Sequence, residues 1–222
     1  MKILFIGNSF TYFNDMPKTV DAMLKRTYPD AVVESVTKGG YFLSRHLDDD
    51  DALCGLAKAK LSESRDYVIL QEQSFCPVGD NERFMRGVLG LSELIKPTGA
   101  KILMYSTWAY RNGSEKLEKT GLGYEEMKDK LFSAYKEAAI AVGGEVVDVG
   151  NLFYGIMKEH PECDLLLTTD NYHPSALGSL AIASLFTLTL GGKSETVDSV
   201  SELPYAEKVI SLTKEFYEKQ SI

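Results

Sequence analysis

The sequence is poor in cysteine and histidine, with three of each among 222 residues. No two cysteines form a C-x-x-C pair, and no two histidines lie at ligand spacing. We therefore expect reduced thiols packed in the interior, with neither a disulfide framework nor a metal site. The phosphate-binding pattern G-x-x-x-x-G-K-[ST] and the dinucleotide-binding pattern G-x-G-x-x-G are also missing, so no cofactor is expected.

Basic residues are outnumbered, because 24 lysines and arginines face 32 acidic residues and the formal net charge is -8. Nucleic-acid binding depends on clustered Lys and Arg that neutralise phosphates, so nucleic acid is not an expected partner. Long hydrophobic runs are missing as well. The apolar stretch at residues 2–6 is far too short for a signal-peptide core or a membrane span. We expect a cytoplasmic protein with no membrane partner, and the sequence leaves the oligomeric state open.

What the chain does contain is typical of a globular protein, with 44% apolar and 25% charged residues. One domain over residues 1–222 is expected, since chains of this length bury a sizeable core. Short β-branched apolar runs predict five strands, and apolar residues three and four positions apart predict helices. The expected strands are residues 3–6, 31–36, 67–70, 101–105 and 145–149, and the expected helices are residues 17–28, 81–96, 124–142, 175–190 and 204–219.

This alternation of strands and helices predicts an α/β fold. The expected architecture is a three-layer α/β/α sandwich around a five-stranded, parallel, doubly wound sheet of the flavodoxin-like type. Functional sites of such sheets lie beyond the carboxyl ends of the strands. Ser9, Gly39-Gly40, Gln71–Ser74 and Trp108 follow the first, second, third and fourth strand in turn, so all four segments are expected on one rim.

A serine, a histidine and an aspartate are the main candidates for chemistry. Ser9 lies in Gly7-Asn8-Ser9-Phe10-Thr11, and Asp170 precedes His173 by three residues. At that spacing one turn brings a carboxylate to an imidazole, and a carboxylate-held imidazole can take the proton of a serine hydroxyl. Taken alone, Ser9 is more often a helix N-cap, but the downstream pair favours Ser9 as a nucleophile.

Other rim residues allow two interpretations each. Gly40 either offers its backbone N–H to an oxyanion, with no Cβ in the way, or is a turn glycine. Gln71 and Gln73 each carry a side-chain amide that could donate to the same oxyanion. Tyr41 and Trp108 are candidates for substrate binding, because aromatic faces pack against sugars and acyl groups, and both are equally compatible with packing.

These motifs resemble the SGNH hydrolase superfamily, related to the GDSL esterases, and in particular its GNSF-type, DUF4886-like branch of bacterial proteins. The resemblance implies that Ser9 is the nucleophile, that Asp170 and His173 belong to the family's D-x-x-H-P element, and that Ser9 and Gly40 supply oxyanion N–H groups. The chain departs from the family in two places: GNS replaces GDS, and a glutamine stands where most members have asparagine. Gln71 is preferred as the third oxyanion donor because it ends the strand, with Gln73 as the alternative.

The predicted function is hydrolysis of small acyl esters by a serine esterase, through an acyl-serine intermediate. The resemblance, and not the sequence pattern, implies that the acyl group is acetate on a carbohydrate. An acyltransferase with the same catalytic residues is one alternative. The other is a non-catalytic, flavodoxin-like binding module in which residues 7–11 cradle a phosphate.

Overall fold

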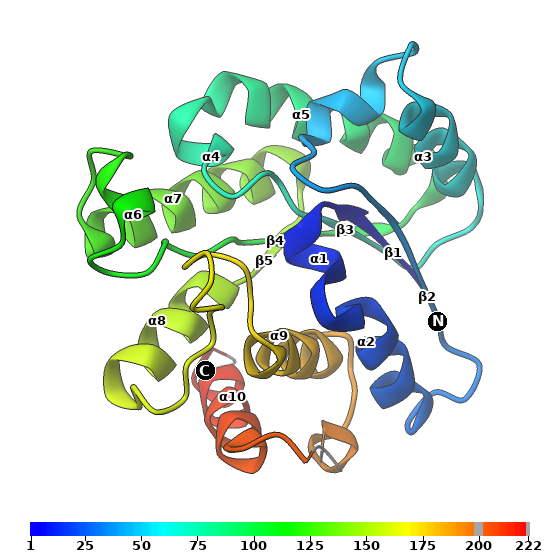
Figure 1. Cartoon of the computed structure of the whole chain (residues 1–222). Helices are drawn as coiled ribbons and strands as arrows, with labels where there is room; N and C mark the ends of the chain where they lie inside the picture. The colour runs from blue at the N-terminus through cyan, green and yellow to red at the C-terminus, as the bar shows by residue number, and fades with distance from the viewer. Residues whose placement is uncertain (198–201, 221–222) are drawn as a thin grey trace.

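A five-stranded parallel sheet forms the middle layer of the molecule (Figure 1). The computed structural model describes residues 1–197 and 202–220; the predicted domain of residues 1–222 includes six residues, 198–201 and 221–222, outside those ranges. The strand order is β2-β1-β3-β4-β5. The strands are β1 (Lys2–Gly7), β2 (Val32–Thr37), β3 (Tyr67–Leu70), β4 (Lys101–Tyr105) and β5 (Glu145–Val147). All five predicted strands are present, and every neighbouring pair is parallel.

Alternate residues of β1, β3 and β4 enter two separate cores, which is why these strands appear as continuous apolar runs. Ile3 and Phe5 of β1 point to one face of the sheet, and Leu4 and Ile6 point to the other. All four side chains are fully buried. The sheet is therefore covered on both faces, and the predicted three-layer α/β/α sandwich is confirmed.

Two groups of long helices form the outer layers, as Figure 1 shows. On the first face lie α2 (Met16–Lys25), α8 (Val149–Glu159), α9 (Ala176–Thr189) and α10 (Ala206–Gln220). On the opposite face lie α3 (Ala52–Ser62), α5 (Asn81–Ile95) and α7 (Tyr124–Val142). The five predicted helices correspond to α2, α5, α7, α9 and α10. Helices α3 and α8 were not predicted.

Helix α9 is apolar on all sides, and residues 177–188 are all buried. A helix of this kind needs partners on every side, and α9 obtains them from the sheet, from α2 beside it and from α10. Within residues 1–197 and 202–220, no helix is both long and apolar enough to cross a membrane.

The chain order places the switch point of the sheet between β1 and β3. The chain leaves β1 for β2 on one side and later returns to β3 on the other. At such a point the two connections diverge and leave a crevice at the carboxyl ends of the strands. Two short helices begin near this crevice, α1 (Ser9–Tyr12) after β1 and α4 (Cys76–Gly79) after β3, and a third, α6 (Glu115–Glu118), lies between β4 and α7.

Candidate active site

Ser9 is the first residue of α1, directly beyond the turn that ends β1. The N-cap of α1 is Asn8, whose Oδ1 accepts the backbone N–H of Phe10 at 3.1 Å. Asn8 is fixed further by donating its Nδ2 to the carbonyl oxygen of Tyr41 and its backbone N–H to Gln71 Oε1, both at 2.9 Å. Because Asn8 performs the capping, the Ser9 hydroxyl is not needed for it.

Gly7 is required in this turn by a close approach of side chains. A Cβ at Gly7 would lie 2.6 Å from both Gln71 Oε1 and Thr11 Oγ1. Those two atoms are hydrogen-bonded to each other at 2.8 Å beneath the turn. Because Gly7 has no side chain, the Gln71 amide can pack directly against the turn that leads to Ser9.

The structure brings Ser9, His173 and Asp170 together. His173 Nε2 lies 2.8 Å from Ser9 Oγ, and His173 Nδ1 lies 2.7 Å from Asp170 Oδ2. An ionised carboxylate only accepts hydrogen bonds, so Nδ1 is the donor and Nε2 is left to accept the Ser9 hydroxyl proton. This arrangement has the geometry of a nucleophile, a base and a group that orients the base.

Asp170 is held as a charged acceptor by the backbone. Its Oδ1 accepts the N–H groups of Tyr172 and His173, each at 3.0 Å. Burial pushes the pKa of the Asp170 carboxyl up, but these N–H donors and the His173 ring outweigh burial, and the pKa lies below its ordinary value. The charge that orients His173 is therefore stable at neutral pH.

Asp170 and His173 lie in the loop of residues 160–175, which joins α8 to α9. Backbone hydrogen bonds within the loop hold its conformation. Leu167 donates to the carbonyl of His173 and Asn171 donates to the carbonyl of Leu167, both at 2.9 Å. Asn171 has a φ of 67°, in the left-handed region that asparagine tolerates best among residues with a side chain. The backbone N–H of Arg111 ties this turn to the β4–α7 connection at 2.9 Å.

Aromatic rings hold the imidazole in place. Phe13 stacks on His173 with ring centroids 4.2 Å apart and 5° between the planes, and Tyr172 contacts the ring at 4.2 Å. Phe10 meets the edge of the imidazole and is itself stacked on Trp108, at 4.4 Å and 6°. Packing on several sides restricts the ring to the orientation in which Nε2 faces Ser9.

The substrate-binding role predicted for Trp108 and Tyr41 is not supported by their positions. Trp108 is 1% exposed, lies between Phe10 and Phe153, and donates its Nε1–H to the Tyr172 carbonyl at 2.9 Å. Tyr41 is 3% exposed and contributes its carbonyl oxygen to Asn8. The rings of both residues are covered by neighbouring side chains, so these residues pack against the site residues and do not face the substrate.

A pocket of about 320 Å³ opens beside the Ser9–His173 pair. The residues that line it come from the turn after β1, the loop after β2, the segment after β3, α6 and the loop of Asp170. They are Asn8, Ser9, Phe10, Tyr12, Phe13, Gly39, Gly40, Gln73, Ser74, Lys116, Tyr172 and His173. The segments after β1, β2 and β3, which were predicted to share one rim, therefore line one cavity, whereas Trp108, after β4, is not part of its lining.

Two backbone N–H groups in the pocket lining are available to a ligand. Neither Ser9 N nor Gly40 N donates a hydrogen bond within the described parts of the chain. Gly40 has a φ of 65°, and no heavy atom lies within 4 Å of the place where a Cβ would be. The Ser9 N–H also lies at a helix N-terminus, where negative charge is stabilised.

Gln71, the glutamine preferred from the sequence, is not placed to act on a substrate. It is 1% exposed, its Oε1 accepts from Asn8 N and Thr11 Oγ1, and its Nε2 donates to the carbonyl of Glu72. Both ends of the amide are therefore used inside the fold. The expectation that Gln71 faces the oxyanion is corrected: its amide organises the turn under Ser9.

Gln73, the alternative, lines the pocket. Its Oε1 accepts the backbone N–H groups of Phe75 and Cys76, both at 3.1 Å, at the start of α4. Because those two groups are donors, the amide oxygen must face them and the Nε2 must face away. Among the residues that the structure describes, Nε2 makes one bond, to Ser74 Oγ at 3.2 Å, and its second N–H is left for a ligand.

Sequence reasoning missed Phe13 and Lys116, which also line the pocket. Phe13 stands only four residues after Ser9, so its proximity was foreseeable, but its stacking on His173 was not. Lys116 lies in the connection between β4 and α7, which carries no motif. Nothing in the sequence around it indicates a contact with the site.

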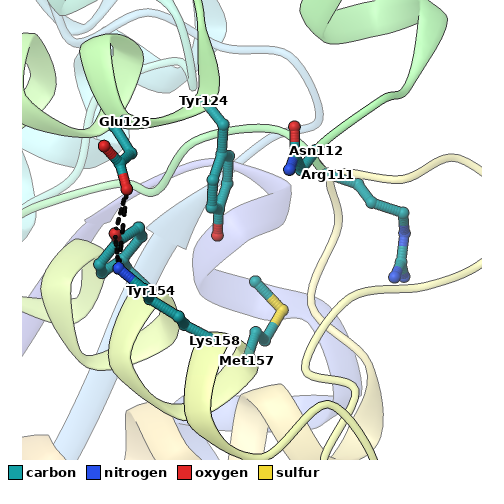
Figure 2. A pocket seen from close by; sticks show the side chains of 7 residues that line it. All are labelled: Arg111, Asn112, Tyr124, Glu125, Tyr154, Met157 and Lys158. Atoms are coloured by element: carbon teal, nitrogen blue, oxygen red, sulfur yellow. Dashed lines mark hydrogen bonds and ion pairs between the residues drawn. The ribbon is translucent and has the colours of Figure 1, made fainter.

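A second, larger cavity of about 410 Å³ lies between the β4–α7 connection and α8 (Figure 2). Figure 2 shows Tyr124 projecting into it, with Glu125, Tyr154 and Lys158 joined by hydrogen bonds and an ion pair at one side. None of Ser9, His173 and Asp170 lines this cavity. In the described part of the chain, no group of three or more His, Cys, Asp or Glu side chains could hold a metal ion.

Comparison with known proteins gives neither a matching family model nor a matching curated protein. Among solved structures, a protein from Slackia heliotrinireducens assigned to the SGNH hydrolases is 34% identical, with a TM-score of 0.77, and the match covers 86% of this chain and 99% of that one. A DUF4886 family protein from Bacteroides uniformis is 17% identical, covering 100% and 96%, with a TM-score of 0.71.

A mutant of an acetyl-xylooligosaccharide esterase from Geobacillus stearothermophilus is 21% identical, covering 89% of this chain and 96% of the other, with a TM-score of 0.61. The likeness to this esterase and to the DUF4886 protein shows a shared fold. The Slackia protein is close enough in sequence, over nearly its whole length, to show common descent. The chain belongs to the SGNH hydrolase superfamily.

Proposed function

We propose that the protein is a serine esterase that releases small acyl groups, with acetyl esters of carbohydrates as the substrate class. The observation that carries the proposal is the hydrogen-bonded series from Ser9 Oγ through His173 to Asp170, with contacts of 2.8 and 2.7 Å. Membership of the SGNH hydrolases supports the same reaction type. The series lies at the mouth of a pocket and at the switch point of the sheet, where this fold class binds its ligands.

In the acylation half-reaction, His173 Nε2 takes the proton of the Ser9 hydroxyl while Ser9 Oγ bonds to the ester carbonyl carbon. The carbonyl oxygen becomes an oxyanion. The imidazolium is stabilised by the Asp170 carboxylate on Nδ1. As the tetrahedral species collapses, the bond to the alcohol oxygen breaks, His173 returns the proton to that oxygen, and an acyl-serine remains.

Deacylation repeats these steps with water as the nucleophile. His173 takes a proton from the water, the hydroxide attacks the acyl carbon, and the proton returns to Ser9 Oγ as the carboxylic acid leaves. The oxyanion of both half-reactions is assigned to the N–H groups of Ser9 and Gly40 and to the Nε2 of Gln73. Each such donor lowers the barrier by about 3 kcal/mol in related hydrolytic chemistry.

The size and lining of the pocket support a small substrate. A volume of about 320 Å³ is at the lower end of the range for small-molecule sites, roughly 300–1,000 Å³. Tyr12, Phe13 and Tyr172 line it and give it an aromatic surface, which suits sugars and acyl groups alike. Esterases that act on acetylated xylan or its oligosaccharides share the fold, which supports acetate as the acyl group.

The test is release of p-nitrophenol from acetyl, butyryl and octanoyl esters by purified wild type and by Ser9→Ala. We expect turnover that is highest for the acetyl ester and is lost in Ser9→Ala. Ser62→Ala, an exposed serine in α3, is the matched control and keeps wild-type rates. Equal turnover by wild type and a folded Ser9→Ala would refute the proposal.

The acyltransferase alternative is separated by products. With a sugar acceptor and an acetyl ester present, the esterase forms free acetate faster than acetylated sugar. Acetylated sugar as the faster product would instead place the protein among acyltransferases, because only the group that attacks the acyl-serine differs between the two reactions.

A further inference from the structure

Lys116 is the feature of the pocket that the proposed reaction leaves unused. It comes from α6, the four-residue helix between β4 and α7, and it lines the pocket beside Ser9 and His173. The other lining residues of the described chain are neutral, apart from the titratable His173. A single ammonium group therefore faces the space that an ester substrate has to enter.

Two tyrosine rings hold the ammonium. Lys116 Nζ lies 3.2 Å from the ring centroid of Tyr172 and 5.0 Å from that of Tyr110. Both distances are within the range of cation–π attraction. Tyr110 is itself fixed by a 2.7 Å hydrogen bond to Ser74. The rings fix the position of the ammonium without neutralising its charge.

The nearby carboxylates are engaged elsewhere. Glu115, its neighbour in α6, pairs with Lys119 at 2.7 Å. Asp170 acts on Lys116 electrostatically, but its oxygens are bonded to His173 and to the backbone. Within residues 1–197 and 202–220, no ion pair of Lys116 is formed. Charge complementarity in this pocket is left for a substrate to provide.

The surroundings of Lys116 also strengthen an ion pair with a ligand. Burial lowers the pKa of the ammonium, and attraction to Asp170 offsets part of that effect. The ammonium is thus partly removed from water, where a bond to an opposite charge is stronger than on the open surface. The rest of the protein is acidic, with a formal net charge of -8, so an anionic substrate is attracted locally rather than by the whole surface.

We propose that Lys116 selects acetyl esters whose alcohol part carries a carboxylate, as an acetylated acidic sugar does. This inference rests on the proposed esterase function. Because an acetyl group has no place for a charge, the carboxylate that meets Lys116 belongs to the alcohol part. Lys116 is a specificity-determining residue in this assignment: it contacts the substrate away from the ester carbonyl, and Ser9 and His173 carry out the chemistry.

The test compares 3-acetoxybenzoate with its neutral methyl ester, for wild type and the variants Lys116→Met, Lys116→Arg and Lys119→Met. Methionine keeps the length of the side chain without its charge, and arginine keeps the charge. Lys119 is the matched control, since it lies just beyond the same helix, 71% exposed, and is not part of the pocket lining. Rates are taken from the released phenol, with Ser9→Ala as the background.

We expect Lys116→Met to lower kcat/KM for 3-acetoxybenzoate about tenfold, mainly through KM, and to change kcat/KM for the methyl ester less than about twofold. Lys116→Arg and Lys119→Met should stay close to wild type on both esters. Added salt should reduce the preference of the wild type for the anionic ester.

Equal losses on the two esters in Lys116→Met would overturn the inference, because Lys116 would then act through Asp170 and His173. Unchanged kinetics on both esters would overturn it too, and in either case Ser9-dependent turnover of the methyl ester leaves the esterase function standing. If the wild type hydrolyses neither ester, nor the p-nitrophenyl esters, the proposed function itself fails and the inference falls with it.

Discussion

Replacing Glu72 by glutamine is expected to change how the stability of the protein depends on pH. Glu72 follows β3 and is completely buried. Its Oε1 accepts the backbone N–H groups of Leu43 at 3.2 Å and Gln73 at 2.6 Å, and its Oε2 shares the Leu43 N–H at 3.2 Å. Burial raises the pKa of the carboxyl to about 8, even though the Gln73 and Leu43 N–H groups favour the charged form.

The size of the effect follows from the two pKa values, 4.5 as the ordinary value and about 8 in the folded chain. Between these pH values the folded protein keeps a proton that the unfolded chain has lost. The contribution of Glu72 to the free energy of unfolding is thus fully present below pH 4.5 and is lost as the pH rises towards 8. At about 1.4 kcal/mol per pKa unit, the total loss is about 5 kcal/mol.

Urea unfolding of wild type and Glu72→Gln at pH 5 and pH 9 measures this loss, because other titrating groups affect both proteins alike. Glutamine is a suitable neutral replacement, since one oxygen accepts both N–H groups in the folded protein. We expect similar stabilities at pH 5 and a variant that is more stable than wild type by about 4 kcal/mol at pH 9.

Glu82→Gln, at an exposed glutamate of α5, is the control and should show no such divergence. A difference between wild type and Glu72→Gln that stays constant within about 1 kcal/mol from pH 5 to pH 9 would refute the reasoning. It would mean that the backbone donors compensate for burial and that the carboxyl titrates alike in the folded and unfolded chain.

Two further predictions concern the site. Asp170→Asn removes the charge that accepts His173 Nδ1–H and should lower kcat by about 10³–10⁴-fold in ester hydrolysis with little loss of stability; a kcat within tenfold of wild type would contradict the role of Asp170. Because the pKa of Asp170 is lowered, the wild type should show no loss of activity from this group between pH 5 and 9. Gln73→Leu should lower kcat about 10²-fold with KM nearly unchanged. Gln71→Leu removes the acceptor of the Asn8 N–H and should instead lower the free energy of unfolding, measured in urea, by about 2 kcal/mol. A loss of kcat in Gln71→Leu and a loss of stability in Gln73→Leu would assign the oxyanion role to Gln71.

The fold was predictable because the inner strands β1, β3 and β4 are buried on both faces and therefore appear as continuous apolar runs, as in residues 3–6. Helix α8 was not predicted because strand and helix share one apolar stretch: β5 ends at Val147, and Asp148 caps α8 by accepting the N–H of Asn151 at 3.1 Å. Helix α3 lacks a clear apolar stripe, so its periodicity gave little signal.

The Ser9, His173 and Asp170 constellation was predictable because the carboxyl ends of parallel strands share one rim and because Asp170 and His173 are close in sequence. The roles of the glutamines were not, since both follow β3 and only the turn after Leu70 decides that Gln71 points under Ser9 and Gln73 into the pocket. The type of a residue does not reveal whether its side chain faces a pocket or the protein interior. The ring of Trp108 could have lined the pocket, but it packs on Phe10 inside the fold.

The aromatic support of His173 and the cation of the pocket are properties of tertiary packing. Phe13 reaches the imidazole because α1 and the 160–175 loop meet over the sheet, and the hydroxyl of Tyr105 ties α1 to β4 by donating to the Phe10 carbonyl at 3.0 Å. Lys116 reaches the site through a connection of no recognisable pattern. Neither contact is encoded in local sequence spacing.

The activated nucleophile is tested most directly by covalent trapping. Wild-type protein is treated with a fluorophosphonate at neutral pH, and the adduct is located by intact mass and peptide mapping, with His173→Ala as the control. We predict one adduct per chain, on Ser9, formed rapidly in the wild type and not in His173→Ala. An adduct on Ser74, the other serine of the pocket, or a wild type that labels no faster than His173→Ala, would contradict the assignment of Ser9 as the nucleophile activated by His173.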